Sequence, residues 1–411
     1  MSINDISPAS LLKEQQAHIK SQQLEPGEEN HYRIWQNLAS PYSYKVMTYM
    51  NYKGIPYKRI EANMKSHMED IPRMVGQSIV PVMLSPNGDI LQDSTPIIEW
   101  LEERHPDKPV VPEDARLAFL MWLLEELADE YMPRIHMHTR WGNKQNQNAA
   151  SHRIGRELAY AIPDASVSDL AAFMLSRQAG FNKHLGLTDR VRENMDRQVL
   201  DLLFILDEHF LHYQFLLGDK PSLADFALYG SLKVHLYSDP NSKEIMEVHS
   251  PKTCNWIENI TALGDVRGCA GQTTFGDWIN LDDGVPKSLH KLLSFSAKTY
   301  IPFAQACAQA SKNKSKTFDA EVYGLEETFS THQYRVWSFE QLQNRYEKLH
   351  GDEKQFVDEA LKNSGVLPLM MADGIVHSDL FDGFTPPVIK NGATDARIRY
   401  LLDKGEKAGM L

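Results

Sequence analysis

The run Ser40-Pro41-Tyr42-Ser43 constrains the fold more than any other stretch of this 411-residue sequence. It follows residues 31–35, which read as a strand, and it opens residues 42–54, which read as a helix. Serine is a preferred N-cap, and proline is a preferred first helical residue. A serine hydroxyl, free backbone N–H groups and the positive end of a helix dipole therefore converge here, which predicts a site for an anion.

The next stretch of the chain predicts a small sheet with helices. Asp93-Ser94 stands at the expected start of a helix, where acidic and hydroxyl side chains act as caps. Pro81 lies inside an expected strand, which is unusual because proline cannot donate to a sheet ladder. The expected strands are 57–60, 79–84 and 90–92, and the expected helices are 67–75 and 95–105.

With Ser40-Pro41, Val80-Pro81 and Asp93-Ser94 in this order, residues 31–106 resemble the thioredoxin-like domain of cytosolic glutathione S-transferases, the GST superfamily. The resemblance implies an α/β domain with a four-stranded mixed sheet, a cis bond before Pro81 and glutathione as the bound co-substrate. Each motif alone is weak, but the order and spacing of the three make a specific combination.

Residues 107–282 predict an all-helical domain, because strand patterns nearly vanish after the proline-rich bridge 107–112. Long helices are expected at 113–141 and 196–213, each with apolar residues at helical spacing. Ser222 and Asp225 have the spacing of a capping box. An all-helical second domain with such a box is also similar to the GST superfamily.

Residues 283–411 form an extension that typical members of the superfamily lack, and we expect it to be α+β. Before the first domain, residues 1–30 are polar and predict a flexible leader. In the extension we expect helices at 287–310, 336–350 and 353–363, a hairpin within 316–334 around Gly324, and an extended tail from 367.

Composition excludes several classes of function. The formal charge of −12 comes without a basic block, which argues against binding to nucleic acid or to an anionic membrane. A run of about 18 apolar residues is missing, so no membrane span is expected. The three cysteines, Cys254, Cys269 and Cys307, are scattered and lack metal-ligand spacing, which predicts a reducing, cytoplasmic setting and no metal.

The resemblance implies that Ser40 is the catalytic residue, with Tyr42 and Ser43 beside it. A free thiol has a pKa of about 8.5 and is therefore mostly protonated at neutral pH. A transferase must then stabilise the glutathione thiolate with a hydroxyl donor and a helix N-terminus. Ser40 stands where zeta-type members carry their serine and where glutaredoxins and omega-type members carry the first cysteine of Cys-Pro-Tyr-Cys. Delta- and theta-type members have their serine one residue earlier, at Ala39. The alternative is that Ser40 is only an N-cap.

The resemblance also implies where the rest of glutathione binds. The backbone of Val80, before Pro81, would pair with the cysteinyl part like an added strand. Asp93 and Ser94 would hold the γ-glutamyl end, unless they only cap their helix. Many relatives carry Lys or Gln immediately before Val-Pro for the glycyl end. This chain has Ile79 there, so Gln77 or Ser78 would have to reach in its place.

The middle of helix 113–141 would line the pocket for the second substrate, which points to Tyr131, His136 and Arg140. The acidic run 125–130 on this helix is expected to be a solvated face. His136 and His138 are two residues apart, so their rings point in different directions on a helix and do not predict a zinc site.

Three functions are compatible with these residues. The first is a serine-type glutathione transferase that delivers the thiolate to a small electrophile or a peroxide, as in detoxification. The second is a non-catalytic binding or assembly protein with this fold, which Ile79 and the extension favour. The third is a glutathione-dependent disulfide reductase. Family members usually form homodimers, and we expect the same here.

Overall fold

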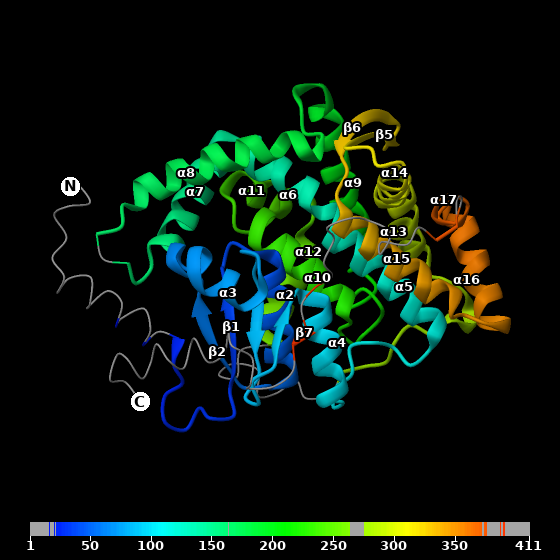
Figure 1. Ribbon diagram of the computed structural model, residues 1–411. Coiled ribbons are helices and arrows are strands. Elements are labelled where there is room, and N and C mark those ends of the chain that lie inside the picture. The colour runs from blue at the N-terminus through cyan, green and yellow to red at the C-terminus, as the bar shows by residue number, and fades with distance from the viewer. Residues whose placement is uncertain are drawn as a thin grey trace. The chain divides into compact units, whose positions relative to one another are not determined.

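The computed structural model describes residues 16, 20, 22–162, 164–263, 275–371, 374–375, 387 and 389–390 (Figure 1). The chain divides into two compact units. Unit 1 is drawn from residues 1–105, 150–175 and 387–411, and unit 2 is drawn from residues 106–149 and 176–386. Cys269, one of the three cysteines, lies outside the described residues.

Unit 1 is built on the predicted mixed sheet. Its strand order is β2-β1-β3-β4, with β1 and β2 parallel and the other neighbours antiparallel. This four-stranded arrangement confirms the thioredoxin-like expectation. The strands are β1 (Tyr32–Gln36), β2 (Tyr57–Glu61), β3 (Val82–Leu84) and β4 (Ile90–Gln92).

The sheet differs from the prediction at two places. Strand β3 begins at Val82 rather than at residue 79, since the chain enters it through the Val80-Pro81 bond. A fifth strand, β7 (Ile389–Lys390), pairs antiparallel with β4, so part of the tail predicted to be merely extended belongs to the sheet. A strand of two residues has too short a pattern for this pairing to be predicted from the sequence.

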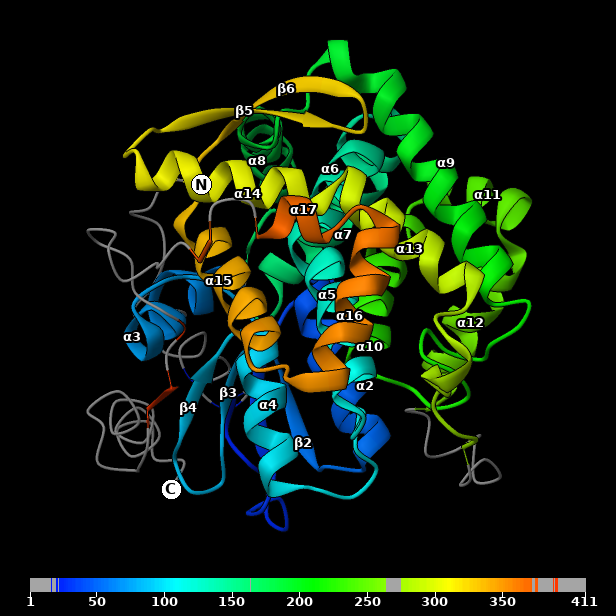
Figure 2. The same ribbon diagram turned by 90° about the vertical axis from the view of Figure 1, so that its right-hand side faces the viewer.

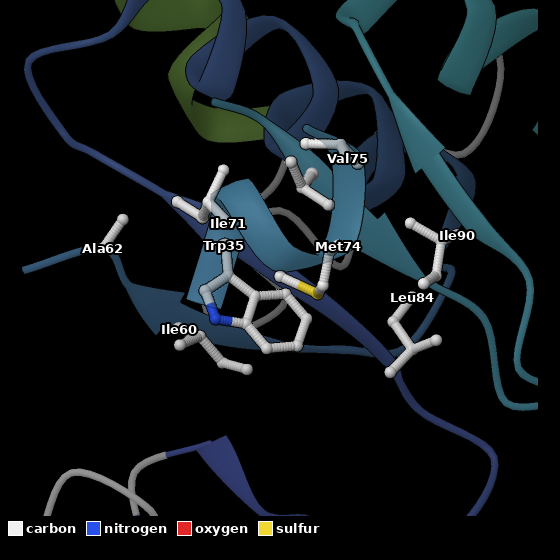
Figure 3. Packing of buried hydrophobic residues seen from close by; sticks show 9 residues of the cluster. Trp35, Ile60, Ala62, Ile71, Met74, Val75, Leu84 and Ile90 are labelled. Carbon is white, nitrogen blue, oxygen red and sulfur yellow. The ribbon is translucent and has the colours of Figure 1, made fainter. Parts of the chain in front are cut away.

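Helices cover both faces of the sheet of unit 1. Helix α3 (Ile71–Val75), which follows a π-helical turn at Ser66–Asp70, packs on one face. Its Met74 and Val75 join Trp35 and neighbouring strand residues in a buried apolar cluster (Figure 3). Helices α2 (Pro41–Lys53) and α4 (Ser94–Arg104) pack against each other.

Local chemistry determines where α2 begins and ends. Ser40 is its N-cap and Pro41 its first residue, as predicted. Gly54 ends it with φ 73°, a left-handed conformation that glycine adopts without a Cβ clash. Within the predicted leader, the buried Gln22 donates to Asp70 Oδ2 of this unit at 2.6 Å, whereas residues 1–15 of the leader lie outside the described residues.

Parts of two further helices belong to unit 1. Helices α7 (Lys144–Ala159) and α8 (Val167–Phe181) supply its residues 150–175. They approach closely at Gly155, where an added Cβ would lie 2.7 Å from the carbonyl oxygen of Val167. Any larger residue would therefore force the two helices apart.

Unit 2 is helical, and its capping box forms as predicted at α10 (Leu223–Ser231). The expected helix 113–141 is instead two helices joined by a π-helical turn at Leu127–Tyr131. The expected helix 196–213 begins earlier and ends at His209. The α-helices in this part are α5 (Ala115–Glu126), α6 (Met132–Trp141), α9 (Arg192–His209), α11 (Pro240–His249) and α12 (Pro251–Leu263), and the shorter turns are Asn182–Leu185, Asp189–Val191, Leu232–Leu236 and Leu281–Asp283.

The helices and the hairpin of the extension belong to the same unit as these helices, whereas its residues 387–411 are assigned to unit 1. Its hairpin lies along α14, and α15 and α16 lie beside α5 (Figure 2). The predicted single helix 287–310 is broken at Thr299, and the second hairpin strand ends at Ser330. The elements are α13 (Lys287–Lys298), α14 (Tyr300–Lys312), β5 (Thr317–Val322), β6 (Leu325–Ser330), α15 (Gln333–Glu347), α16 (Gly351–Ser364) and α17 (Leu367–Met370).

Packing of the extension overturns the expectation of a solvated acidic face on α5. Glu125, Glu126, Asp129 and Glu130 are all buried. The Glu126 carboxylate accepts from the Tyr300 hydroxyl at 2.9 Å and from the Ser338 hydroxyl at 2.7 Å. Burial and the neighbouring Glu125 raise the pKa of Glu126. Across the part of the chain that is described, no helix has the length and apolar character needed to cross a membrane.

Candidate functional site

The predicted binding motifs meet at one end of the sheet of unit 1. The pairing of Trp35 with Val82 brings the end of β1 to the start of β3. Val82 also pairs with Gln92, which brings the end of β4 to the same edge. The loop that leads to Ser40, the Val80-Pro81 bond and Asp93-Ser94 each lie directly beyond these strand ends.

Ser40 occupies the N-terminus of α2. Its side chain accepts a hydrogen bond from the backbone N–H of Ser43 at 3.3 Å. A hydroxyl that accepts through its oxygen keeps its own hydrogen to donate. Ser40 can therefore cap its helix and donate to a bound anion at the same time, so the two alternatives for this residue do not exclude each other. Ser40 and Tyr42 are half-buried, whereas Ser43 is buried.

A hydrogen-bonded chain holds the loop before Ser40. The Asn37 amide nitrogen donates to the carbonyl oxygen of Ala62 at 2.8 Å, which turns its Oδ1 toward His67 Nε2, also at 2.8 Å. In the neutral ring, Nε2 therefore carries the hydrogen and Nδ1 accepts from the Ser78 hydroxyl at 2.8 Å. This chain connects the segment before Val80 to the segment before Ser40.

Val80-Pro81 has the expected cis bond. The backbone N–H of Asp93 donates to the carbonyl oxygen of Pro81 at 3.4 Å, so two of the predicted glutathione contacts are neighbours. Val80 is half-buried and packs against the apolar cluster under α3. These contacts hold the Val80 backbone at the open end of β3.

The start of α4 lacks a side-chain cap from Asp93 among the described residues. Asp93 has φ 80°, a conformation that costs a non-glycine residue about 1–3 kcal/mol. Within the described part of the chain, its side chain forms no capping hydrogen bond. The Ser94 hydroxyl is fully buried and has no hydrogen-bond partner among the described residues. A buried hydroxyl without a partner is costly, which is typical of a place that a ligand fills.

Lys45 is a polar neighbour of this site that the sequence did not reveal. It lies in α2 with a relative exposure of 1%. Its ammonium group donates to the Thr95 hydroxyl at 2.8 Å, in the first turn of α4. A buried positive charge beside a helix N-terminus adds to the attraction for a carboxylate. The signal was present as a lysine on the inner face of α2, but its burial depends on packing against α4.

Glu157 is a second residue that sequence reasoning missed. It lies in α7 within unit 1, and its Oε2 accepts from the backbone N–H of Ala39 at 3.3 Å. Burial is the main reason why the pKa of Glu157 is raised to about 7. Nothing in the local pattern of a polar helix far along the chain could have pointed to the residue before Ser40.

The predicted contacts for the glycyl end are on the surface. Ile79 is exposed, with a relative exposure of 52%. Gln77 is also exposed, and its amide donates to Gln92 Oε1 at 3.3 Å. Both residues border the open end of β3, and their roles in binding stay predictions.

The predicted pocket residues Tyr131, His136 and Arg140 belong to unit 2 and are buried there. Tyr131 donates its hydroxyl to Gln198 Oε1 at 2.6 Å. The ring of His136 stacks on His235 with a centroid distance of 4.0 Å. These contacts give them structural roles, and their place in a substrate pocket stays a prediction.

Arg140 pairs with a buried carboxylate. Its Nε donates to the buried Asp239 carboxylate at 2.7 Å, so the guanidinium group already has a charged partner. No cluster of His, Cys, Asp and Glu suited to a metal ion occurs among the residues that the structure describes. Cys254 and Cys307 are buried free thiols, and burial raises the pKa of both.

Comparison with known families adds two matches in the expected order. Residues 37–109 match the family model for the N-terminal domain of glutathione S-transferases, and residues 171–263 match the model for the C-terminal domain. The two matched segments correspond to the thioredoxin-like part and to the helical part of the chain.

Individual relatives match over parts of the chain. Glutathione S-transferase omega-1 of Sus scrofa is 22% identical over 127 residues, which cover 31% of this chain and 53% of the relative. Maleylpyruvate isomerase of Ralstonia sp. is 32% identical over 87 residues, which cover 20% of this chain and 39% of the relative. The chain thus spans about half or less of the length of these curated relatives.

A solved glutathione S-transferase from Rhodospirillum rubrum F11 aligns with 64% of this chain and 91% of its own. The sequence identity is 18% and the TM-score is 0.38. The extension lies beyond both matched segments, the second of which ends at residue 263.

Proposed function

Because the chain belongs to the glutathione S-transferase superfamily, we propose that it binds glutathione at the open end of the unit 1 sheet and activates its thiol. In the reaction the glutathione thiol loses its proton to solvent and the thiolate attacks a small electrophile, so that a carbon–sulfur bond forms as the bond to a leaving group breaks. With a peroxide as the oxidant, the thiolate instead breaks the O–O bond, the alcohol leaves and the glutathione sulfur is oxidised to a sulfenic acid. The observation that carries the proposal is the Ser40 hydroxyl, which caps α2 through its oxygen and keeps its hydrogen for the thiolate.

Each neighbouring motif has a proposed part in binding. The Val80 backbone pairs with the cysteinyl unit, and Asp93 receives the γ-glutamyl ammonium group. Ser94, whose buried hydroxyl lacks a described partner, receives the carboxylate together with the N-terminus of α4. The Lys45 ammonium group, 2.8 Å from the Thr95 hydroxyl, strengthens that carboxylate site. Tyr42, Ser43, Gln77 and Ile79 border the same end of the sheet.

Two other functions use the same site. A disulfide reductase would need every thiol from glutathione, because Ser40 and Ser43 replace both cysteines of the redox motif and serine forms no mixed disulfide. A non-catalytic binding protein would hold glutathione without lowering its thiol pKa. The exposed Ile79 in place of a glycyl-binding side chain supports this second alternative.

The test is calorimetric titration of glutathione into the wild type and Ser40→Ala, with thiolate absorbance followed against pH. We expect binding to both proteins, and a thiol pKa lowered by about one unit or more in the wild type only. Ser43→Ala is the matched control, because its hydroxyl accepts from the Asn37 N–H at 3.4 Å inside the loop. Equal thiol pKa values in free and bound glutathione would favour the binding protein, and absent binding would refute the proposal.

Location and assembly are proposed from the family. We infer a cytoplasmic protein and a two-fold homodimer, with a small electrophile as the second substrate. The extension helices α15 and α16 pack on α5, so the dimer would have to form without that face of the helix. Light scattering of the full chain measures the mass directly.

A further inference from the structure

The loop that carries Ser40 is held by a buried carboxyl group from a distant part of the chain. Glu157 has a relative exposure of 8%, and its Oε2 accepts from the Ala39 N–H at 3.3 Å. Its Oε1 is buried and has no hydrogen-bond partner among the described residues. A carboxylate that is both buried and half-unpaired is costly to keep charged, so its presence here needs a reason beyond stability.

From this geometry we propose that Glu157 is a positioning residue that holds the Ser40 loop more firmly when ionised than when protonated. The inference rests on the proposed function, because the loop matters only if Ser40 serves a ligand. The ionised carboxylate forms a charge-assisted hydrogen bond with Ala39, about twice as strong as a neutral one. Protonation weakens that bond and leaves the Ala39 N–H less firmly held.

The charged surroundings set the pH at which this change occurs. Burial raises the pKa of Glu157 to about 7, the Ala39 and Leu38 N–H groups lower it, Glu61 raises it and Arg153 lowers it. Tyr44 lies on α2, and burial together with the charge of Glu157 raises its pKa. The carboxylate therefore forms as the pH rises through about 7, and its hydrogen bond with the Ala39 N–H becomes stronger as the pH rises.

Two other titratable groups must be separated from Glu157. His67 bonds Asn37 Oδ1 at 2.8 Å in the same loop, and histidine is the side chain that ordinarily changes charge around neutral pH. Glu61 lies at the end of β2 and is paired with Arg59 at 3.2 Å. Glu61 acts on Glu157 through charge, and its carboxylate bonds Arg59 and no loop residue among those that the structure describes, which makes it a useful control.

The first measurement follows the loop itself. The Ala39 amide resonance of the full-length chain, labelled with [15N]alanine and assigned by its loss in Ala39→Gly, is recorded from about pH 5.5 to 8. We expect it to titrate with a midpoint near pH 7 in the wild type and not in Glu157→Gln. Glu61→Gln should keep the step and move it to lower pH, because a negative neighbour has been removed.

The second measurement links the loop to the ligand. S-methylglutathione has no ionisable thiol, so the pH dependence of its affinity reports on the protein. We expect the affinity of the wild type to rise about fivefold between about pH 6 and 8, and that of Glu157→Gln to stay near the low-pH value. Glu61→Gln should retain the rise at lower pH.

Several outcomes would overturn the inference. A wild-type Ala39 resonance that shows no step with pH would refute the inference. A wild-type step that persists in Glu157→Gln would refute it too, because the titrating group would then be another one, such as His67. Should Glu157→Gln fail to fold, His67→Gln decides, because a step that persists in that variant belongs to another group and a step that is lost there refutes the role of Glu157. A step in the Ala39 resonance without any S-methylglutathione binding would refute the proposed function and leave the loop contact established.

Discussion

Two helices of this protein begin with the same residue types and are completed in opposite ways. At α10 in unit 2, the Asp225 carboxylate accepts from the Ser222 N–H at 2.9 Å, the Leu216 N–H at 2.8 Å and the Trp256 indole at 3.2 Å. At α4 in unit 1, the Asp93 side chain forms no capping bond within the described residues. The Ser94 hydroxyl beside it has no described partner.

The difference separates a helix start that is satisfied from within the chain from one that we propose binds a ligand. The α10 terminus satisfies its donors from within the chain, so an incoming anion finds none left. The α4 terminus keeps a buried Ser94 hydroxyl that has no partner among the described residues, and Asp93 before it holds a strained backbone at φ 80°. Residue type alone does not distinguish the two, because both use Ser and Asp.

The largest expected effect comes from breaking the complete terminus. Asp225→Ala should lower the free energy of unfolding by about 3–5 kcal/mol, because it leaves buried N–H and hydroxyl donors without their acceptor. Urea unfolding followed by tryptophan fluorescence measures it. Asp93→Ala is the matched control and should change stability by less than about 1 kcal/mol. Equal losses in the two variants would erase the contrast between the helices.

The effect of Asp225→Ala should also depend on pH. Burial raises the pKa of Asp225 to about 6, above its value in the unfolded chain. The stability it contributes is therefore full below the unfolded pKa of about 4 and decreases as the pH rises toward about 6. The measured loss should be greater near pH 4 than near pH 7.

The next effect uses the strained residue at the open terminus. Asp93→Gly should raise the free energy of unfolding by about 0.5–1 kcal/mol, because glycine adopts φ 80° without a Cβ clash. It should also weaken glutathione binding at least about tenfold, because it removes the carboxylate that would pair with the γ-glutamyl ammonium group. Calorimetry and urea unfolding of the same samples test both. Asp93→Asn, which removes only the charge, should share the loss of affinity without the gain in stability.

The smallest effect sharpens the comparison at the serines. Ser94→Ala should change stability by less than about 0.5 kcal/mol, since its hydroxyl has no described partner to lose, and should weaken glutathione binding about fivefold. The matched Ser222→Ala should lose about 1–2 kcal/mol of stability. A Ser94→Ala protein that is as unstable as Ser222→Ala would show that the hydroxyl is structural.

Features with a local chemical cause could be predicted from the sequence. The N-cap at Ser40, the capping box at Ser222 and the four main strands follow from short patterns of residues. Features that depend on distant packing could not. The pairing of β7 with β4 rests on two residues of the tail, and the contact of Glu157 with Ala39 joins segments far apart along the chain.

The buried Glu126 has a consequence for how the protein can be divided. Its hydroxyl partners, Tyr300 and Ser338, both come from the extension, whereas Glu126 itself lies in the family-sized helical part. A fragment trimmed at residue 282 would return this acidic side chain and the apolar surface around it to water. The extension is therefore no detachable module, and a fragment that ends at residue 282 cannot be cut from this chain without dismantling the unit that would remain.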